Sequence, residues 1–183
     1  MTRDATAMTA LPAVPPCIVD VAVESELWVA SGAERILRRV LEAAVTAQPA
    51  ASGAELSIVL TDDAAIRRLN HQWRNIDKAT NVLSFPAQRE MPTPAARAVA
   101  APDSPPLLLG DIVLAYETIL REAAEAGMPF AHHLAHLGLH GFLHLMGYDH
   151  DSGAAADIME RLESDILASI AVPDPYRTHE ADA

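Results

Sequence analysis

The chain has 183 residues, a length that suits one domain with a hydrophobic core, and half of its residues are hydrophobic while 21% are charged. The formal net charge of −12 argues against a nucleic-acid partner. No run of 18 apolar residues exists, so we expect no membrane-spanning helix. Cys17 is the single cysteine. It excludes an intrachain disulfide and favours a reducing cytoplasm, where we expect the protein to lie.

The first half of the chain predicts two strand and helix pairs. Residues 1–16 show neither a basic segment nor a long apolar one, which indicates a loose tail rather than a secretory signal. The stretch CIVDVAVESELW (17–28) alternates apolar and acidic residues and predicts a strand, and a helix with apolar residues at helical spacing follows it. Residues 54–63 predict a second strand, after which Asp62 or Asp63 can cap a second helix.

The second half predicts two strands and three helices. A short strand over residues 81–86 ends at Pro86, and the Ala- and Pro-rich residues 87–106 indicate a flexible loop. Residues 107–117 are nearly all apolar and predict a central strand. Three helices are predicted after this strand: the first ends at Gly127, the second spans 130–146, and the third spans about 154–170. The inward residues of the third helix are expected to be Ile158, Met159, Leu162, Ile166 and Leu167.

The order of these elements defines the fold class. The succession β-α-β-α-β-β-α-α-α predicts one α+β domain over residues 17–172, with a mixed four-stranded sheet packed against helices. Residues 173–183 are expected to form a C-terminal tail.

Two histidines of the predicted helix 130–146 are placed to share a metal ion. His140 and His144 are four residues apart, so both rings project from one face and can reach one ion at about 2.0–2.1 Å. His136 lies about 12 Å along the helix axis from His144. Two nitrogen ligands of one ion are at most about 4.2 Å apart. His136 and His144 therefore cannot share an ion.

A third imidazole must come from chain that turns back. Gly147 ends the helix, and the turn after it carries His150 back toward the other two rings. The sequence thus predicts a three-histidine metal site at a helix end. Asp149 and Asp151 can either hold a ligand ring by a hydrogen bond or simply form the turn, and both interpretations remain open.

The ligand types favour zinc. Three neutral imidazoles suit Zn²⁺ better than Mg²⁺ or Ca²⁺, and three protein ligands leave a fourth position for water, as in catalytic zinc sites. Zinc lowers the pKa of that water toward about 7. A zinc peptidase of the H-E-x-x-H type needs a glutamate after the first histidine, but Gly141 stands there. Peptide hydrolysis is therefore not expected.

Basic residues gather in one part of this acidic chain. Residues 35–97 contain nine of the thirteen Lys and Arg and six of the acidic residues. This pattern indicates either a locally basic surface or, as we favour, chance clustering on solvated helices. Trp73 shares a helical face with Leu69 and Ile66, so we expect it in the core; a base-stacking platform is the alternative.

Three separated motifs carry a family resemblance. The stretch HGFLHLMGYDH (140–150) resembles the signature of the YbeY family, which are single-domain bacterial zinc-dependent endoribonucleases of rRNA maturation. The stretches LNHQWRNIDKATNVLSFP (69–86) and LLGDIVLAYET (108–118) resemble two further segments of the same family. The resemblance covers most of residues 54–170 in the same order.

The resemblance implies roles for individual residues. It implies one zinc ion per chain, with His140, His144 and His150 as ligands, and a role for Arg74 in RNA cleavage. It also implies a single-strand-specific endoribonuclease that acts at the 3′ end of 16S rRNA and in ribosome quality control. The partners that it implies are rRNA precursors and the small ribosomal subunit with its proteins. Binding to DNA or to a membrane is not expected. A ribosome-assembly factor with a structural metal and a small-molecule metallohydrolase remain alternatives.

Overall fold

The sheet is mixed and has four strands, as predicted. The computed structural model describes residues 16–88 and 105–176. In spatial order the strands are β1, β2, β4 and β3; β1 and β2 are parallel, β2 and β4 are parallel, and β3 is antiparallel to β4. Their bounds are Ile18–Val23 for β1, Glu55–Thr61 for β2, Val82–Pro86 for β3 and Leu108–Ala115 for β4.

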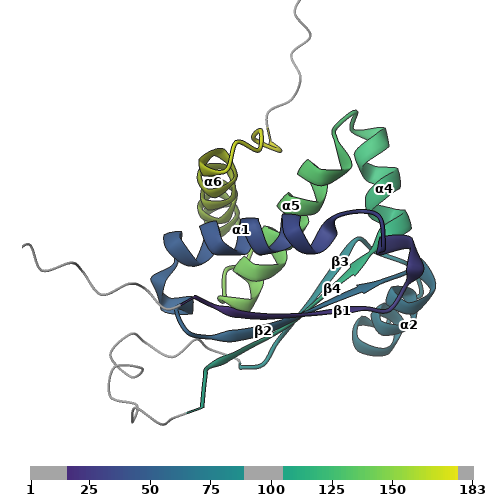
Figure 1. The fold of residues 1–183 in the computed structure, drawn as a ribbon, viewed down its shortest axis with the longest axis horizontal. Coiled ribbons are helices and arrows are strands. Elements are labelled where there is room, and N and C mark those ends of the chain that lie inside the picture. Colours follow the sequence, from purple (N-terminus) through teal and green to yellow (C-terminus); the bar gives the residue numbers. More distant parts are fainter. Residues whose placement is uncertain (1–15, 89–104, 177–183) are drawn as a thin grey trace, which may run out of the picture.

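Five α-helices occur in the described residues, in the predicted order along the chain. Figure 1 shows α1, α5 and α6 together on one side of the sheet and α2 on the other. The predicted first strand ends early, because Ser25 caps a short 3₁₀ turn. The helices are α1 (Ala33–Ala47), α2 (Asp63–Arg74), α4 (Tyr116–Glu125), α5 (Phe130–Leu145) and α6 (Gly153–Ser169).

The two faces of the sheet have separate cores, because successive strand residues point to opposite sides. Ile58 and Ile112 belong to the larger core, which contains the buried residues of α1, α5 and α6. Leu83 and Val113 belong to a smaller core with Ile66 of α2. The helix that bears the histidines and the helix that bears Arg74 therefore lie on opposite faces of the sheet.

Helix α2 is fixed at its N-terminal end. Asp62, one of the two predicted caps, accepts a hydrogen bond of 2.7 Å from the backbone N–H of Ala65. Asp63 instead accepts bonds of 3.0 and 2.7 Å from the N–H and hydroxyl of Thr118 at the start of α4. These bonds hold the first turns of α2 and α4 together. The C-terminal end of α2, which bears Arg74, lies away from this contact.

The inward face of α6 differs from the prediction. Met159 and Ile166 are buried as expected, but Ile158 is 57% exposed. Glu163 is buried with 0% exposure on the same face, four residues after Met159 and three before Ile166. The apolar pattern therefore predicted most of this face correctly, including Leu167, but missed the carboxylate at its centre.

Some predicted segments lie outside the described residues. Residues 1–15 of the predicted N-terminal tail, residues 89–104 of the predicted loop, and residues 177–183 are in this group. Residues 173–176, predicted as the start of a tail, contact α6, where the Ser164 hydroxyl donates to Asp174 over 3.0 Å. Among the helices of the described segments, none combines the length and hydrophobicity that crossing a membrane requires.

Candidate metal centre

The three predicted histidines converge at the C-terminal end of α5. Ring nitrogens of His140, His144 and His150 all lie within 4.8 Å of one another. The Nε2 atoms of His140 and His144 are 3.0 Å apart. Two nitrogens bound at about 2.05 Å to one tetrahedral ion are about 3.3 Å apart, so the observed separation is close to that of a shared ion. The sequence-based placement of these rings is confirmed.

Hydrogen bonds at the far side of two rings define their protonation. The Nδ1 atom of His140 lies 2.8 Å from a carboxylate oxygen of Glu163, and the Nδ1 atom of His144 lies 3.0 Å from the carbonyl oxygen of Tyr148. Both oxygens can only accept, so each Nδ1 carries the proton, and each neutral ring keeps a lone pair on Nε2. Two lone pairs then face each other over 3.0 Å. A cation between them would relieve this repulsion, and the donor set fits zinc.

The glycine turn brings in the third ring. Gly147 has a φ of 87°, a left-handed conformation in which glycine is favoured, and it follows the last turn of α5. The backbone N–H of Tyr148 donates to the carbonyl of Leu143 over 3.0 Å and closes this helix end. His150 is exposed, and its ring centroid is 5.1 Å from that of His144. His140 and His144 are thus held within the last turns of α5, and the exposed ring of His150 lies beside them.

The nearby aspartates act in the turn. Asp149 accepts a hydrogen bond of 2.6 Å from the backbone N–H of His150, which lowers the pKa of its carboxyl group. Neither Asp149 nor Asp151 has a hydrogen bond to a ligand ring among the described residues. The turn-forming interpretation therefore fits, and the ring-holding role belongs to a residue that the sequence did not indicate.

That residue is Glu163 of α6. It is fully buried and contacts His140, although 23 residues separate the two in the chain. Burial alone raises the pKa of Glu163, but hydrogen bonds from His136, His140 and Tyr176 outweigh burial and lower the pKa to about 2. A signal was present in the sequence: an acidic residue stands on the apolar face of a helix between Met159 and Ile166.

The position after the first histidine has no room for a side chain. A Cβ atom added to Gly141 would lie 2.9 Å from Cγ2 of Ile112 and 3.2 Å from the hydroxyl oxygen of Ser84. The Ser84 hydroxyl also donates to the carbonyl of Gly141 over 3.2 Å. Helix α5 therefore lies directly on the sheet at this point, and a peptidase glutamate cannot be accommodated.

The protonated form of His144 is disfavoured. Burial, together with the neighbouring His140 and His150, lowers the pKa of His144 below its ordinary value. A neutral ring is the form that binds a metal ion. The environment of His144 therefore favours the metal-binding form near neutral pH.

Arg74 and Trp73 lie on the other side of β3. Ser84 of this strand faces α5, while the next residue, Phe85, faces α2, where its ring centroid is 5.9 Å from that of Trp73. The side chain of Arg74 is exposed and forms no hydrogen bond or ion pair with residues 16–88 and 105–176. The structure does not bring Arg74 into contact with the histidines, so its catalytic role remains a prediction.

The expectation that Trp73 is buried is wrong. Its side chain is 64% exposed, and Ile76 nearby is 51% exposed. The helical spacing correctly predicted the direction of the side chain, since Ile66 is buried on the same face of α2. However, Trp73 lies in the last turn of α2, over the edge strand of the sheet, where no element of the described chain covers it.

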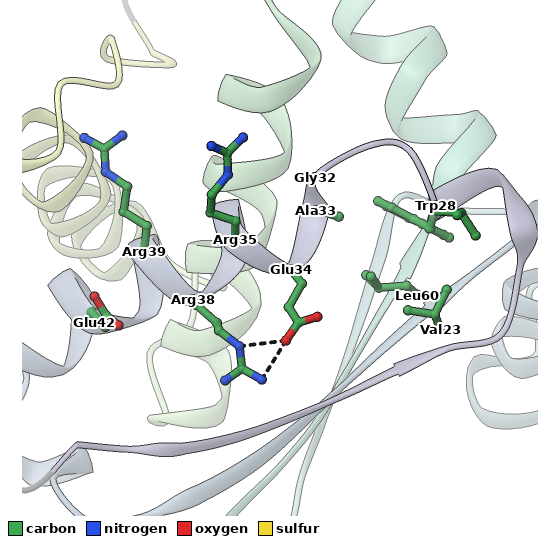
Figure 2. Close-up of a pocket in the computed structure, with 11 residues that line it drawn as sticks. Val23, Trp28, Gly32, Ala33, Glu34, Arg35, Arg38, Arg39, Glu42 and Leu60 are labelled. Atoms are coloured by element: carbon green, nitrogen blue, oxygen red, sulfur yellow. Dashed lines mark hydrogen bonds and ion pairs between the residues drawn. The ribbon is translucent and has the colours of Figure 1, made fainter.

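A surface hollow of about 740 Å³ lies away from the histidines, beside α1. Its apolar floor includes Trp28 and Leu60. Figure 2 shows Arg35 and Arg39 on one side of α1, while Arg38 projects toward β1 and pairs with Glu34 at 2.9 Å. None of the three histidines lines this hollow, and no potential metal-binding cluster of the described residues lies in it.

The basic residues that the structure describes within segment 35–97 do not form one surface. Those of α1 and those of α2 lie on opposite faces of the sheet (Figure 1). In α2, Arg67 forms a bidentate pair with Asp77 at 2.6 and 2.8 Å. These observations agree with the interpretation that the charges are distributed over solvated helices.

An α+β fold with a mixed sheet and three convergent histidines at a helix end defines the class: a small protein with a candidate metal centre between a helix and its returning chain. Residues 22–171 match the family model described as Endoribonuclease YbeY. The chain belongs to this family, as its three motifs predicted.

Similar proteins cover nearly the whole chain. A protein of Nitrobacter hamburgensis named Endoribonuclease YbeY is 51% identical over 92% of this chain and 86% of its own length. One of Bradyrhizobium with the same name is 49% identical over 93% of this chain and 98% of its own length. The solution structure of TM1509 from Thermotoga maritima is similar with a TM-score of 0.52 and 23% identity, and it covers 88% of this chain and 100% of that one. This last similarity supports the fold.

Proposed function

We propose that the protein is an endoribonuclease that cleaves single-stranded RNA with one zinc ion held by His140, His144 and His150. The observation that carries this proposal is the convergence of the three rings, with the Nε2 atoms of His140 and His144 only 3.0 Å apart. Family membership supports RNA as the substrate. The biological substrate that we propose is the 3′ end of precursor 16S rRNA, with a further role in ribosome quality control in the cytoplasm.

Each residue has a defined task in this proposal. When bound, zinc supplies a Lewis acid that polarises a phosphoryl oxygen or activates water. The two partly buried ligand rings, those of His140 and His144, hold their protons on Nδ1, which keeps both Nε2 atoms available without any proton transfer. Arg74 uses its planar fork to bind two phosphoryl oxygens, on which negative charge gathers during cleavage.

The RNA path follows from the position of β3. This strand is an edge of the sheet, with the histidine cluster on one side and the C-terminal end of α2 on the other. A single strand that crosses this edge can contact both, and the exposed ring of Trp73 provides a surface on which a base can stack. A rigid duplex cannot bend around one strand in this way, which gives the preference for single-stranded RNA a physical reason.

The proposal is tested with purified protein. We expect about one zinc ion per chain and cleavage of a single-stranded RNA, with a duplex of the same sequence resistant. His144→Ala should abolish both zinc binding and cleavage. Full cleavage by a folded His144→Ala variant would contradict the proposal.

A second function is favoured by the charge of the protein. The net charge of −12 suits docking to basic proteins of the small ribosomal subunit better than direct binding to RNA. In this alternative the protein is an assembly factor whose metal is structural. Cells that lack the gene distinguish the two functions: rescue by Arg74→Ala and by folded ligand variants supports the assembly factor, and failure of every folded ligand variant supports the nuclease.

A further inference from the structure

A buried carboxylate touches the candidate metal centre without belonging to its three ligands. Glu163 has 0% exposure, and one of its oxygens, Oε1, lies 2.8 Å from Nδ1 of His140. A carboxylate on the second nitrogen of a ligand imidazole fixes the tautomer and the direction of the ring. Glu163 thus determines which way the lone pair of His140 points.

The second oxygen of Glu163 is held by two other residues. Oε2 of Glu163 lies 3.1 Å from Nε2 of His136 and accepts a hydrogen bond from the hydroxyl group of Tyr176. The three donors come from α5 and from the chain after α6. A carboxylate group rotated to another orientation would lose hydrogen bonds to these three donors. His136, which cannot reach the ion that His144 binds, therefore has a task of its own, to hold Glu163.

The segment that carries Tyr176 is itself attached to the fold. Asp174 accepts hydrogen bonds of 3.0 Å from the Ser164 hydroxyl and 3.0 Å from the backbone N–H of Tyr176. A guanidinium N–H of Arg39 donates to the carbonyl of Ile170 over 2.7 Å at the end of α6. In Figure 2, Arg39 points toward the ribbon of this C-terminal part. These contacts bring Tyr176 back along α6 to Glu163.

A second metal ion between His136, His140 and Glu163 explains these contacts less well. Ligand atoms of these three residues do lie within 4.8 Å of one another. However, the two carboxylate oxygens face different rings, at 2.8 and 3.1 Å. One ion would need the ring nitrogens to converge on a common point, whereas two separate N–H donors give the observed pairs.

We propose that Glu163 and Tyr176 are positioning residues for the metal ligand His140, so that the chain after α6 sets the metal affinity of the centre. The inference rests on the proposed metal site. It extends that site from three ligands to a chain of hydrogen bonds that runs from Tyr176 through Glu163 to His140. Removing Tyr176 loosens the carboxylate, and removing the carboxylate loosens the ligand ring.

The test measures zinc affinity by competition with a chromophoric chelator. We expect Glu163→Gln to weaken zinc binding about 10- to 100-fold, as is typical for carboxylate partners of ligand histidines, and Tyr176→Phe to weaken it by a smaller factor. The d–d absorption spectrum of the Co²⁺-substituted protein should change in both variants, because it reports ligand geometry rather than stability.

Two matched controls separate positioning from general stability. Glu122 pairs with His133 of α5 at 2.9 Å, a carboxylate–histidine pair that touches no ligand, so Glu122→Gln should keep wild-type zinc affinity. Tyr116→Phe removes a partly buried hydroxyl elsewhere in the same core and should also have no effect. Wild-type affinity in Glu163→Gln, or two zinc ions per wild-type chain, would overturn the inference and leave the three-histidine site intact. A wild-type protein that binds no zinc would overturn the proposed function as well.

Discussion

The two sides of strand β3 contrast in how completely their candidate functional residues are held. On the α5 side, His140 and His144 each have a hydrogen bond that fixes the ring, and the carboxylate behind His140 has three donors. On the α2 side, Trp73 is 64% exposed and Arg74 has no polar partner in the described chain. The side chains of the first region are held by the protein itself, while those of the second are exposed to solvent and available to a partner.

This difference fits a division, in the proposed function, between residues that hold the metal ion and residues that contact the RNA. A metal centre needs ligands fixed within fractions of an ångström, because its affinity depends on their geometry. A surface that binds a flexible single strand gains from side chains that can adapt to it. The two regions should therefore respond differently to mutation, and the following predictions test that difference.

The largest effect is expected from a ligand. His144→Ala should lower RNA cleavage by roughly 1,000-fold or more and remove zinc, because the ion loses one of two rigidly placed rings. Cleavage kinetics and elemental analysis of the same sample measure both. Zinc retained at one ion per chain in this variant would show that the ion lies elsewhere.

The two tryptophans provide a direct comparison of the buried and the exposed region. Trp28 is 3% exposed and donates to the carbonyl of Thr61 over 2.8 Å, so Trp28→Ala should lower the free energy of unfolding by about 3–5 kcal/mol. Trp73→Ala should lower it by less than about 0.5 kcal/mol but raise KM for single-stranded RNA about tenfold. Denaturant unfolding and steady-state kinetics distinguish the outcomes. An unchanged KM would exclude a stacking role for Trp73.

Arg74 is expected to affect the reaction without affecting the metal centre. Arg74→Ala should lower kcat by about 100-fold, and Arg74→Lys should recover only part of this loss because an ammonium group lacks the fork. Zinc affinity should remain at the wild-type value, since Arg74 lies across β3 from the ligands. Arg68→Ala, in the exposed part of the same helix, is the control and should have a much smaller effect on kcat.

The smallest effect concerns acid stability of the metal-free protein. The pKa of Glu163 is lowered to about 2, so the folded state holds this group ionised where the unfolded chain has begun to bind a proton. Its contribution to stability is present above the unfolded value of 4.5 and is lost as the pH falls from about 4.5 toward 2. We expect a loss on the order of 2 kcal/mol across this window. Chemical denaturation at several pH values should show a shallower decline for Glu163→Gln, and an equal decline in both proteins would contradict this account.

The features that could be predicted from the sequence are those that depend only on the residue spacing within one helix, strand or turn. The alternation of β1, the apolar run of β4 and the four-residue spacing of His140 and His144 each reflect one element and its immediate geometry. The glycine turn that returns His150 is similarly local.

The remaining features depend on the tertiary contacts that each helix or strand makes with other parts of the chain. Trp73 projects from the same face of α2 as the buried Ile66, but the spacing of apolar residues does not show where α2 extends past the strands that it covers. Glu163 was missed because a hydrophobic pattern treats every acidic residue as outward, whereas its three donors lie in distant segments. Ile158 was misplaced for the same reason, since the carboxylate shifts the buried face of α6.

The tight contact at Gly141 limits which catalysts this scaffold could become. A general base at that position would have to displace Ile112 from the centre of the sheet and Ser84 from its edge, so no single exchange can install one. Conversion toward proteolysis would require a helix raised off its strands and a rebuilt interior beneath it. Designers who want new hydrolytic chemistry from this frame should therefore leave the helix in place and vary the groups around the histidine cluster.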